Sequence, residues 1–262
     1  MYIGTMDYGP FGFMERYDRF WNMWVGGGRS YSFSKQPDAA YGNFETLVTS
    51  LMPILSDSRS RKAAQYELDQ FPEMMTRVVN EMWTKKLGLT KWNHDLYRGL
   101  ENLMQSTRAD FTITFRELSN MPHEMKNGRK SKDLFESFLL KHAFYQVLST
   151  KMQNDWIQWI ENWRSHVEAA VVDLATISKN MKEVNPKFVP REWMLVRAYT
   201  DAQKGIYSSI RELHEVFKNP YDEGTFFFFL CLSVCLSLSL SLCLSLSLSL
   251  CLFVSLSLCL RL

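Results

Sequence analysis

Cysteine is absent from most of this 262-residue sequence. All five cysteines lie between Cys231 and Cys259, so the rest of the chain cannot be a disulfide-rich scaffold. The sequence also lacks a block of basic residues, and its formal net charge is only +2. Because a nucleic-acid surface needs clustered lysine and arginine to displace counterions, we expect no nucleic-acid partner. The first residues match neither a secretory signal nor a mitochondrial presequence.

The last part of the chain, up to Leu260, contains no charged residue and only a few types of amino acid. From Phe226 to Leu260 it contains only Leu, Ser, Cys, Phe and Val. From Leu230 onward, leucine holds most even positions and serine most odd ones, which is the period of a strand and not of a helix. Cysteine recurs at every eighth position from Cys235 to Cys259, as a short DNA repeat would produce. We interpret residues 225–262 as a translated microsatellite, and a membrane anchor is the less favoured alternative.

Strand-like alternation is also scarce in the rest of the chain, and Tyr31 to Phe33 is its best example. The first 42 residues are rich in glycine and aromatic residues and predict loops. From about residue 43 to 217, apolar residues recur three and four positions apart, which predicts helices. The clearest helical patterns cover residues 71–82, 134–148 (started by Ser131), 156–167 and 206–217. The helix breakers between the predicted helices are Pro53, Gly88, Pro122, Gly128, Asn185-Pro186, Pro190 and Pro220.

The strongest candidate for chemistry is the string Asp7-Tyr8-Gly9-Pro10-Phe11-Gly12-Phe13. An aspartate before an aromatic residue and a glycine is the pattern with which kinases hold the magnesium ion that bridges nucleotide phosphates. The tripeptide alone is usually an ordinary turn, but the seven-residue string is much more specific.

Four blocks of sequence occur in the order that one protein family shows. The first block is Met1-Tyr2-Ile3-Gly4 with Asp7 to Phe13, and the second is Gly28-Arg29-Ser30-Tyr31-Ser32-Phe33 with Gln36-Pro37. The third is Lys86-Leu87-Gly88-Leu89 with residues 108–112 and 114–118, and the fourth runs from Asn185-Pro186-Lys187-Phe188-Val189-Pro190-Arg191 through residues 219–223. On these blocks the chain resembles the selenoprotein O family, which are protein adenylyltransferases with a pseudokinase fold.

The resemblance implies a mainly α chain: the C-lobe part of a protein-kinase-like (α+β) fold plus a helical C-terminal region, with the N-lobe missing. It implies a segment 1–42 with the metal-binding motif and following loops, and a helical remainder at 43–224; the repetitive tail at 225–262 lies outside the resemblance. It further implies transfer of AMP from ATP to Ser, Thr or Tyr hydroxyls of protein substrates. Asp7 matches the family's aspartate that binds Mg²⁺ and contacts the nucleotide. For eukaryotic members of the family the expected location is the mitochondrion.

The sequence departs from the family pattern in ways that affect activity. By the resemblance, the family's catalytic Asp and neighbouring Asn fall upstream of Met1, so no catalytic residue is assigned within this chain. We therefore expect the chain as written to be an inactive C-terminal fragment of an adenylyltransferase. The alternative is a helical binding or regulatory module that performs no catalysis.

Other candidate motifs are weaker. Gly26-Gly27-Gly28 lacks the Lys-Ser/Thr that follows a phosphate-binding loop, so a flexible loop is favoured. The spacing of Trp156, Trp159 and Trp163 favours a core-facing stripe over a ligand-stacking face. Asp110 and Arg116 are interpreted as a structural pair. The histidines lack the spacing of a zinc site, namely His94, His123, His142, His166 and His214.

Overall fold

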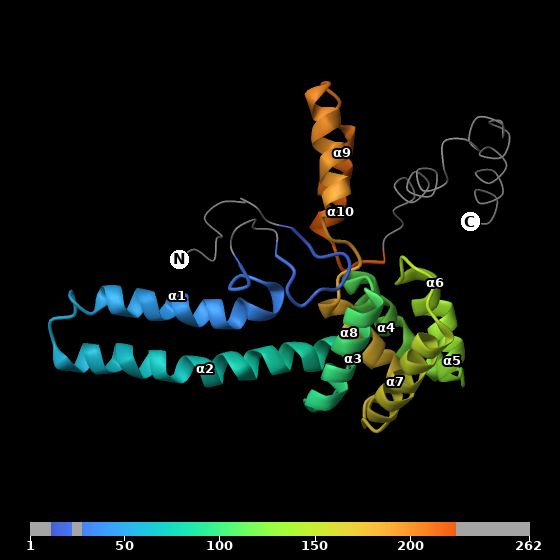
Figure 1. The fold of residues 1–262 in the computed structure, drawn as a ribbon, viewed down its shortest axis with the longest axis horizontal. Coiled ribbons are helices and arrows are strands. Elements are labelled where there is room, and N and C mark those ends of the chain that lie inside the picture. The colour runs from blue at the N-terminus through green and yellow to red at the C-terminus, as the bar shows by residue number, and fades with distance from the viewer. Residues whose placement is uncertain (1–11, 23–27, 224–262) are drawn as a thin grey trace. The chain divides into compact units, whose positions relative to one another are not determined.

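The computed structural model describes residues 12–22 and 28–223 (Figure 1). The chain divides into two compact units, Met1–Asp222 and Glu223–Leu262, and nearly all of the second unit lies outside the described residues. Helices dominate the described part, where the only β-pairing is a single bridge between Arg16 and Asp110. The prediction of a mainly α chain is confirmed. No helix in the described ranges is long and apolar enough to cross a membrane.

Five of the described helices begin at a side chain that caps their first turn, and the others begin without a side-chain cap. The helices are α1 (Gln36–Leu51), α2 (Ser58–Lys86), α3 (His94–Thr107), α4 (Phe111–Met125), α5 (Ser131–Leu134), α6 (Leu140–His142), α7 (Thr150–Glu168), α8 (Leu174–Val184), α9 (Glu192–Gln203) and α10 (Ser208–Lys218). A 3₁₀ turn, η1 (Phe33–Lys35), precedes α1, and a π-helical turn, η2 (Phe135–Leu139), joins α5 to α6. Side-chain oxygens accept hydrogen bonds from the first turns of α2, α3, α4, α7 and α8, and they belong to Asp57, Asn93, Asp110, Ser149 and Asp173.

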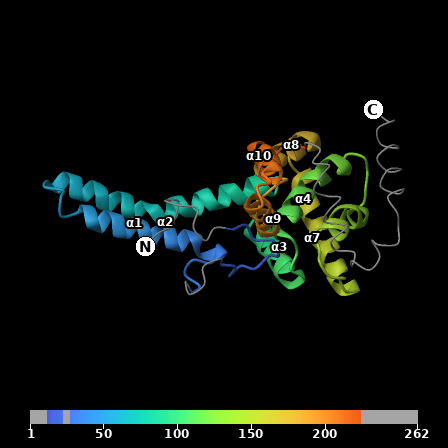
Figure 2. The same ribbon diagram turned by 90° about the horizontal axis from the view of Figure 1, so that it is seen from above.

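The first two helices form an antiparallel hairpin, and α1 runs beside α2 in both views (Figures 1 and 2). Its contacts include the rings of Phe44 and Phe71, which stack with their centroids 4.9 Å apart. In all of α2 only Leu68 and Trp83 are buried. The hairpin therefore has a small core of its own, and only the C-terminal end of α2 joins the main core at Trp83.

The main core lies among α3, α4, α7 and α8, and α7 supplies its largest side chains. Trp156, Trp159 and Trp163 are buried, which confirms the prediction that this stripe faces the core. Two of the indole N–H groups donate to backbone oxygens, Trp159 to Leu96 at 2.9 Å and Trp163 to Leu87 at 2.8 Å. These bonds tie α7 to α3 and to the end of α2, whereas the indole N–H of Trp156 is buried without a hydrogen-bond partner.

Three local predictions are wrong. Tyr31 to Phe33 is not a strand but a turn that leads into η1. Pro122 does not break a helix but lies within α4, because in the last turn it removes a single helical hydrogen bond and its ring is buried. The helix predicted over 134–148 ends at His142, because the following loop binds α4: the Asp110 amide donates to the Ala143 oxygen at 2.8 Å.

Candidate functional site

Asp7, the predicted magnesium and nucleotide ligand, lies outside the described residues. Gly12 and Phe13, the last residues of its motif, open the described structure. What the structure defines is the segment that follows the motif, Met14 to Asn22, and how the helices hold it. The contacts between this segment and the helices are the described part of the candidate site.

Backbone hydrogen bonds pair this segment with the residues that start α4. The Phe111 amide donates to the Glu15 oxygen at 2.8 Å, and the Tyr17 amide donates to the Ala109 oxygen at 2.8 Å. These bonds frame the antiparallel bridge between Arg16 and Asp110. Since Asp110 also caps α4, the segment is paired with the rigid beginning of a buried helix.

The side chain of Tyr17 fixes the segment on a second side. It is buried, stacks on Phe111 with ring centroids 6.0 Å apart, and donates from its hydroxyl to Glu101 Oε1 at 2.8 Å. Arg19 Nη2 donates to the other oxygen of Glu101 at 2.7 Å, so one carboxylate of α3 holds two residues of the segment. Burial and the bond to Glu101 raise the pKa of Tyr17, so it stays a donor at neutral pH.

A buried ion pair lies where the segment meets α4. Arg191 binds the Asp110 carboxylate with both terminal nitrogens, Nη1 to Oδ2 at 2.6 Å and Nη2 to Oδ1 at 3.0 Å. Tyr145 donates to Oδ2 at 2.6 Å, and the Ile113 amide donates to Oδ1 at 2.8 Å. We call Asp110, Tyr145 and Arg191 the Asp110 clamp. It joins three parts of the chain that are distant in sequence, and Glu15 lies beside it, with Oε2 3.8 Å from Arg191 Nη1.

The buried carboxylate of the clamp has hydrogen-bond partners for both of its oxygens. The Asp110 side chain is fully buried, and its two oxygens together accept four hydrogen bonds. Burial alone would lower the pKa of Arg191, but the hydrogen bonds and charge of Asp110 outweigh it and raise that pKa. Burial and the bond to Asp110 raise the pKa of Tyr145. Arg191 therefore stays charged and Tyr145 keeps its proton across the physiological range, and the clamp acts as a fixed structural joint.

The predicted pair of Asp110 with Arg116 is wrong. Asp110 caps α4 and Arg116 lies in its second turn, but Asp110 pairs with Arg191. Arg116 Nη1 donates to the backbone oxygens of Lys182 and Asn185 at 3.1 and 2.9 Å, and Nη2 donates to that of Tyr221 at 3.1 Å. Arg116 thus fastens the end of α8 and the chain after α10 onto α4.

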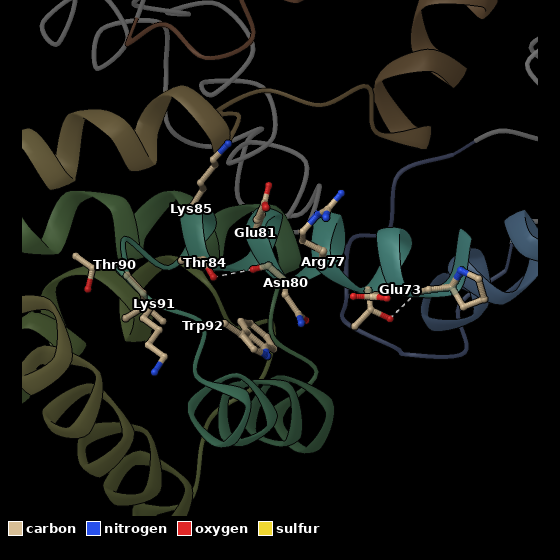
Figure 3. A pocket seen from close by; sticks show the side chains of 12 residues that line it. Glu73, Arg77, Asn80, Glu81, Thr84, Lys85, Thr90, Lys91 and Trp92 are labelled. Atoms are coloured by element: carbon tan, nitrogen blue, oxygen red, sulfur yellow. Dashed lines mark hydrogen bonds between the residues drawn. The ribbon is translucent and has the colours of Figure 1, made fainter. Parts of the chain in front are cut away.

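A second candidate is an open groove of about 950 Å³ along the C-terminal half of α2 and the loop that leads to α3. Arg77, Glu81 and Lys85 point to one side of α2, whereas Asn80 and Trp92 lie on the other (Figure 3). The charges on its lining are mixed in sign. No shape or charge in the groove points to one class of ligand.

The glycine-rich loop and the histidines, the remaining candidates from the sequence, form no ligand site within the described ranges. Gly28 adopts φ 58° in a turn, with Gly26 and Gly27 outside the described residues. His142 lies 3.0 Å from a Glu117 oxygen, and His166 lies 3.0 Å from Asn93 Nδ2. Within residues 12–22 and 28–223, no three His, Cys, Asp or Glu side chains are grouped as a metal site.

The contacts define a helical protein in which a motif-bearing N-terminal segment is fastened to the helical core by buried charged groups. The family model described as protein adenylyltransferase SelO matches residues 2–218. Curated relatives named protein nucleotidyltransferase YdiU come from Flavobacterium johnsoniae, 31% identical, and Salmonella schwarzengrund, 30% identical. Both matches cover 84% of this chain, which spans 42% of the length of either relative.

The chain therefore belongs to the SelO family of protein adenylyltransferases, and the resemblance drawn from the four sequence blocks is confirmed. The relative from Xanthomonas euvesicatoria is 29% identical and is matched over 41% of its length. The chain thus corresponds to about two fifths of these relatives.

The sequence does not reveal the partners of Asp110 in the clamp, nor Glu101, which holds Tyr17 and Arg19. Arg191 appears in the fourth block, but no role follows from its position there. Tyr145 and Glu101 carry no motif at all. Because Arg191 and Asp110 are 81 residues apart, no local pattern could pair them.

Proposed function

We propose that this chain is the part of a protein adenylyltransferase that contributes the magnesium ligand Asp7, in an enzyme that transfers AMP from ATP to Ser, Thr or Tyr hydroxyls of proteins. Membership in the SelO family supports the class of reaction. The observation that carries the proposal for this chain is the anchoring of the segment after Asp7. A motif that must hold a metal–nucleotide complex benefits from a fixed attachment to the core.

The donor chemistry fits the proposed ion. Mg²⁺ keeps several waters and is usually held by one or two carboxylates together with the phosphates of a substrate. A single aspartate in the motif is compatible with that pattern, and residues 12–22 and 28–223 contain no cluster of three or more His, Cys, Asp or Glu side chains that could hold a metal ion. When bound, the ion would neutralise charge on the phosphate oxygens of ATP. The residues of this chain would orient Asp7 and support the surrounding C-lobe of the kinase-like fold.

We further propose that the chain alone does not transfer AMP, since it spans only 42% of its relatives. Its protein substrates and its mitochondrial location stay predictions.

Two measurements test the function. The full chain should bind Mg²⁺·ATP in calorimetric titration, and Asp7→Asn should abolish that binding. The matched control is Asp95→Asn, whose side chain is fully exposed on α3. Equal affinity in wild type and Asp7→Asn would refute the role of Asp7.

The second measurement concerns the group that is transferred. Residues 2–218 would replace the matching region of the Flavobacterium johnsoniae relative, and the hybrid would be incubated with ATP labelled at either the α- or the γ-phosphate. AMP transfer labels protein only from the α-phosphate. Label from the γ-phosphate alone would instead indicate a kinase.

The second candidate function, a non-catalytic binding module, is supported by the exposed apolar side chains of α9, of α10 and of the residue just before α10. Trp193, Tyr199, Tyr207 and Ile210 are each between 42% and 53% exposed. Large apolar groups clustered on a surface often mark a protein contact. An active hybrid that loses α-phosphate labelling on Asp7→Asn would exclude a purely non-catalytic role.

A further inference from the structure

One face of α2 carries apolar side chains that the described chain leaves exposed. Met74, Val78 and Met82 lie four residues apart, so they follow one face of the helix. Helix α1 runs beside α2, yet these three side chains are between 40% and 51% exposed. We call them the apolar stripe of α2. Apolar side chains that cluster on a surface in this way often mark a contact with another protein.

A row of charged residues runs beside the apolar stripe, offset from it by one position along the helix. All members of this charge row are exposed, and their signs alternate: Glu73, Arg77, Glu81 and Lys85. Figure 3 shows the last three on one side of α2. None of the four takes part in an ion pair within residues 12–22 and 28–223. A row of mixed sign suits no ligand of a single charge, but it can match a second copy of itself.

The match requires that two copies of α2 run antiparallel about a two-fold axis level with Val79. Residues equally far before and after Val79 are then in contact across the interface. Glu73 meets Lys85 of the second copy and Arg77 meets Glu81, so every contact in the charge row joins opposite charges. In a parallel pair in register each residue would face its own copy, and every contact would join like charges.

The same axis interleaves the two apolar stripes. With a rise of about 1.5 Å per residue, Met74 and Val78 lie about 7.5 Å and about 1.5 Å before the axis, and Met82 lies about 4.5 Å after it. The second copy has its own three side chains at the opposite heights. Apolar side chains from the two copies therefore alternate about every 3 Å along the interface, as packed helices require.

We propose that α2 is a homodimerisation surface, at which two copies of this chain associate through the apolar stripe and the charge row in antiparallel orientation. The charge complementarity of the row with itself selects a second copy over an unrelated partner. Because each copy contributes only three apolar residues to the centre of the interface, we expect a weak dimer with a Kd of about 10–100 µM.

Charge reversal in the full chain tests the charge row. Arg77→Glu and Glu81→Arg each bring like charges together at two symmetric positions, and each should weaken dimerisation about tenfold. The double variant Arg77→Glu/Glu81→Arg restores opposite charges and should dimerise within about threefold of wild type. The control Lys151→Glu makes the same change of charge at an exposed residue of α7 and should dimerise like wild type. Sedimentation equilibrium measures each Kd, and circular dichroism confirms that each variant is folded.

A zero-length carbodiimide cross-link identifies the surface directly, since this reagent joins a carboxylate to a lysine that touches it. Within one copy of α2, Glu73 and Lys85 are about 18 Å apart along the helix, too far for direct contact. A peptide in which these two residues are joined must therefore come from two copies. We expect this product in wild type and in the double variant, at about tenfold lower yield in either single variant.

Three outcomes would overturn the proposal. A chain that stays monomeric up to about 1 mM has no such dimer. Association without the cross-link between Glu73 and Lys85, or association that persists unchanged in both single variants, would proceed through another surface. A loss of dimer in the single variants that the double variant does not restore would mean that the charge row does not face itself, and that α2 contacts a different partner.

Discussion

Helices α2 and α4 have similar sequence patterns but differ in what they bury. In α4, nine of 15 residues are buried, whereas in the 29 residues of α2 only Leu68 and Trp83 are. Apolar residues of α2 such as Met74, Val78 and Met82 lie four positions apart and are 40% to 51% exposed. A helical period therefore predicts a helix without showing whether another element covers its apolar face.

The difference arises from neighbours that are distant in sequence. Helix α4 packs against α8 and the turn η2, and its start is held by the clamp. Helix α2 has α1 along most of its length, and only its last turns reach the core through Trp83, Lys86 and Leu87. The end of α2, which we call the junction, connects the hairpin of α1 and α2 to the main core around α4. Mutations on either side of the junction can therefore compare these two regions.

The largest expected effect is in the core. Trp163→Ala removes a fully buried indole and its bond to the Leu87 oxygen, and we expect it to lower the free energy of unfolding by about 3–5 kcal/mol. Met74→Ala on α2 should cost less than about 1 kcal/mol, because its side chain is 40% exposed. Urea unfolding followed by circular dichroism measures both. Equal losses would mean that the apolar stripe of α2 is covered, and the contrast between the regions would disappear.

A smaller effect is expected at Gly88, where α2 turns toward α3. Gly88 has φ +66°, and an added Cβ would lie 2.5 Å from Met181 Sδ and 2.8 Å from Ile177 Cγ2 of α8. Both backbone strain and crowding should oppose Gly88→Ala, which we expect to destabilise the protein by about 2–3 kcal/mol.

Gly128→Ala is the matched control for this substitution. Gly128 has φ +77° with nothing within 4 Å of the added Cβ, so it reports backbone strain alone, about 1 kcal/mol. If both substitutions cost the same in urea unfolding, the close contact between this turn and α8 does not limit stability.

Much of the fold could be predicted from the sequence because it depends on local chemistry. The apolar spacing of α7 and α10, and the stop at Asn185-Pro186, follow from helix period and proline geometry. The early end of the helix at His142 could not be predicted, since it depends on a backbone bond between Ala143 and Asp110. The clamp could not be predicted either, because the sequence does not indicate which of many charged residues will pair with Asp110, and its partner Arg191 is 81 positions away.

The smallest expected effect is a pH dependence at the end of α2. Lys86 Nζ donates to Asn185 Oδ1 at 2.9 Å and lies 5.1 Å from the ring centroid of Phe115. Burial lowers the pKa of Lys86 to about 8 from its usual 10.5. Between these values the unfolded chain binds more protons than the folded one, so this residue makes stability rise with pH.

Above about pH 10 the effect should reverse, because burial raises the pKa values of Tyr17, Tyr97 and Tyr145 and the unfolded chain loses their protons first. The measurement is therefore urea unfolding between about pH 7.5 and 9.5, in wild type and in Lys86→Met. Relative to the variant, wild type should gain about 2 kcal/mol over this range. Lys85→Met, a neighbouring exposed lysine, should follow the wild-type profile. Parallel profiles for wild type and Lys86→Met would mean that the bond to Asn185 keeps Lys86 charged, and that the junction holds a buried cation as firmly as the clamp does.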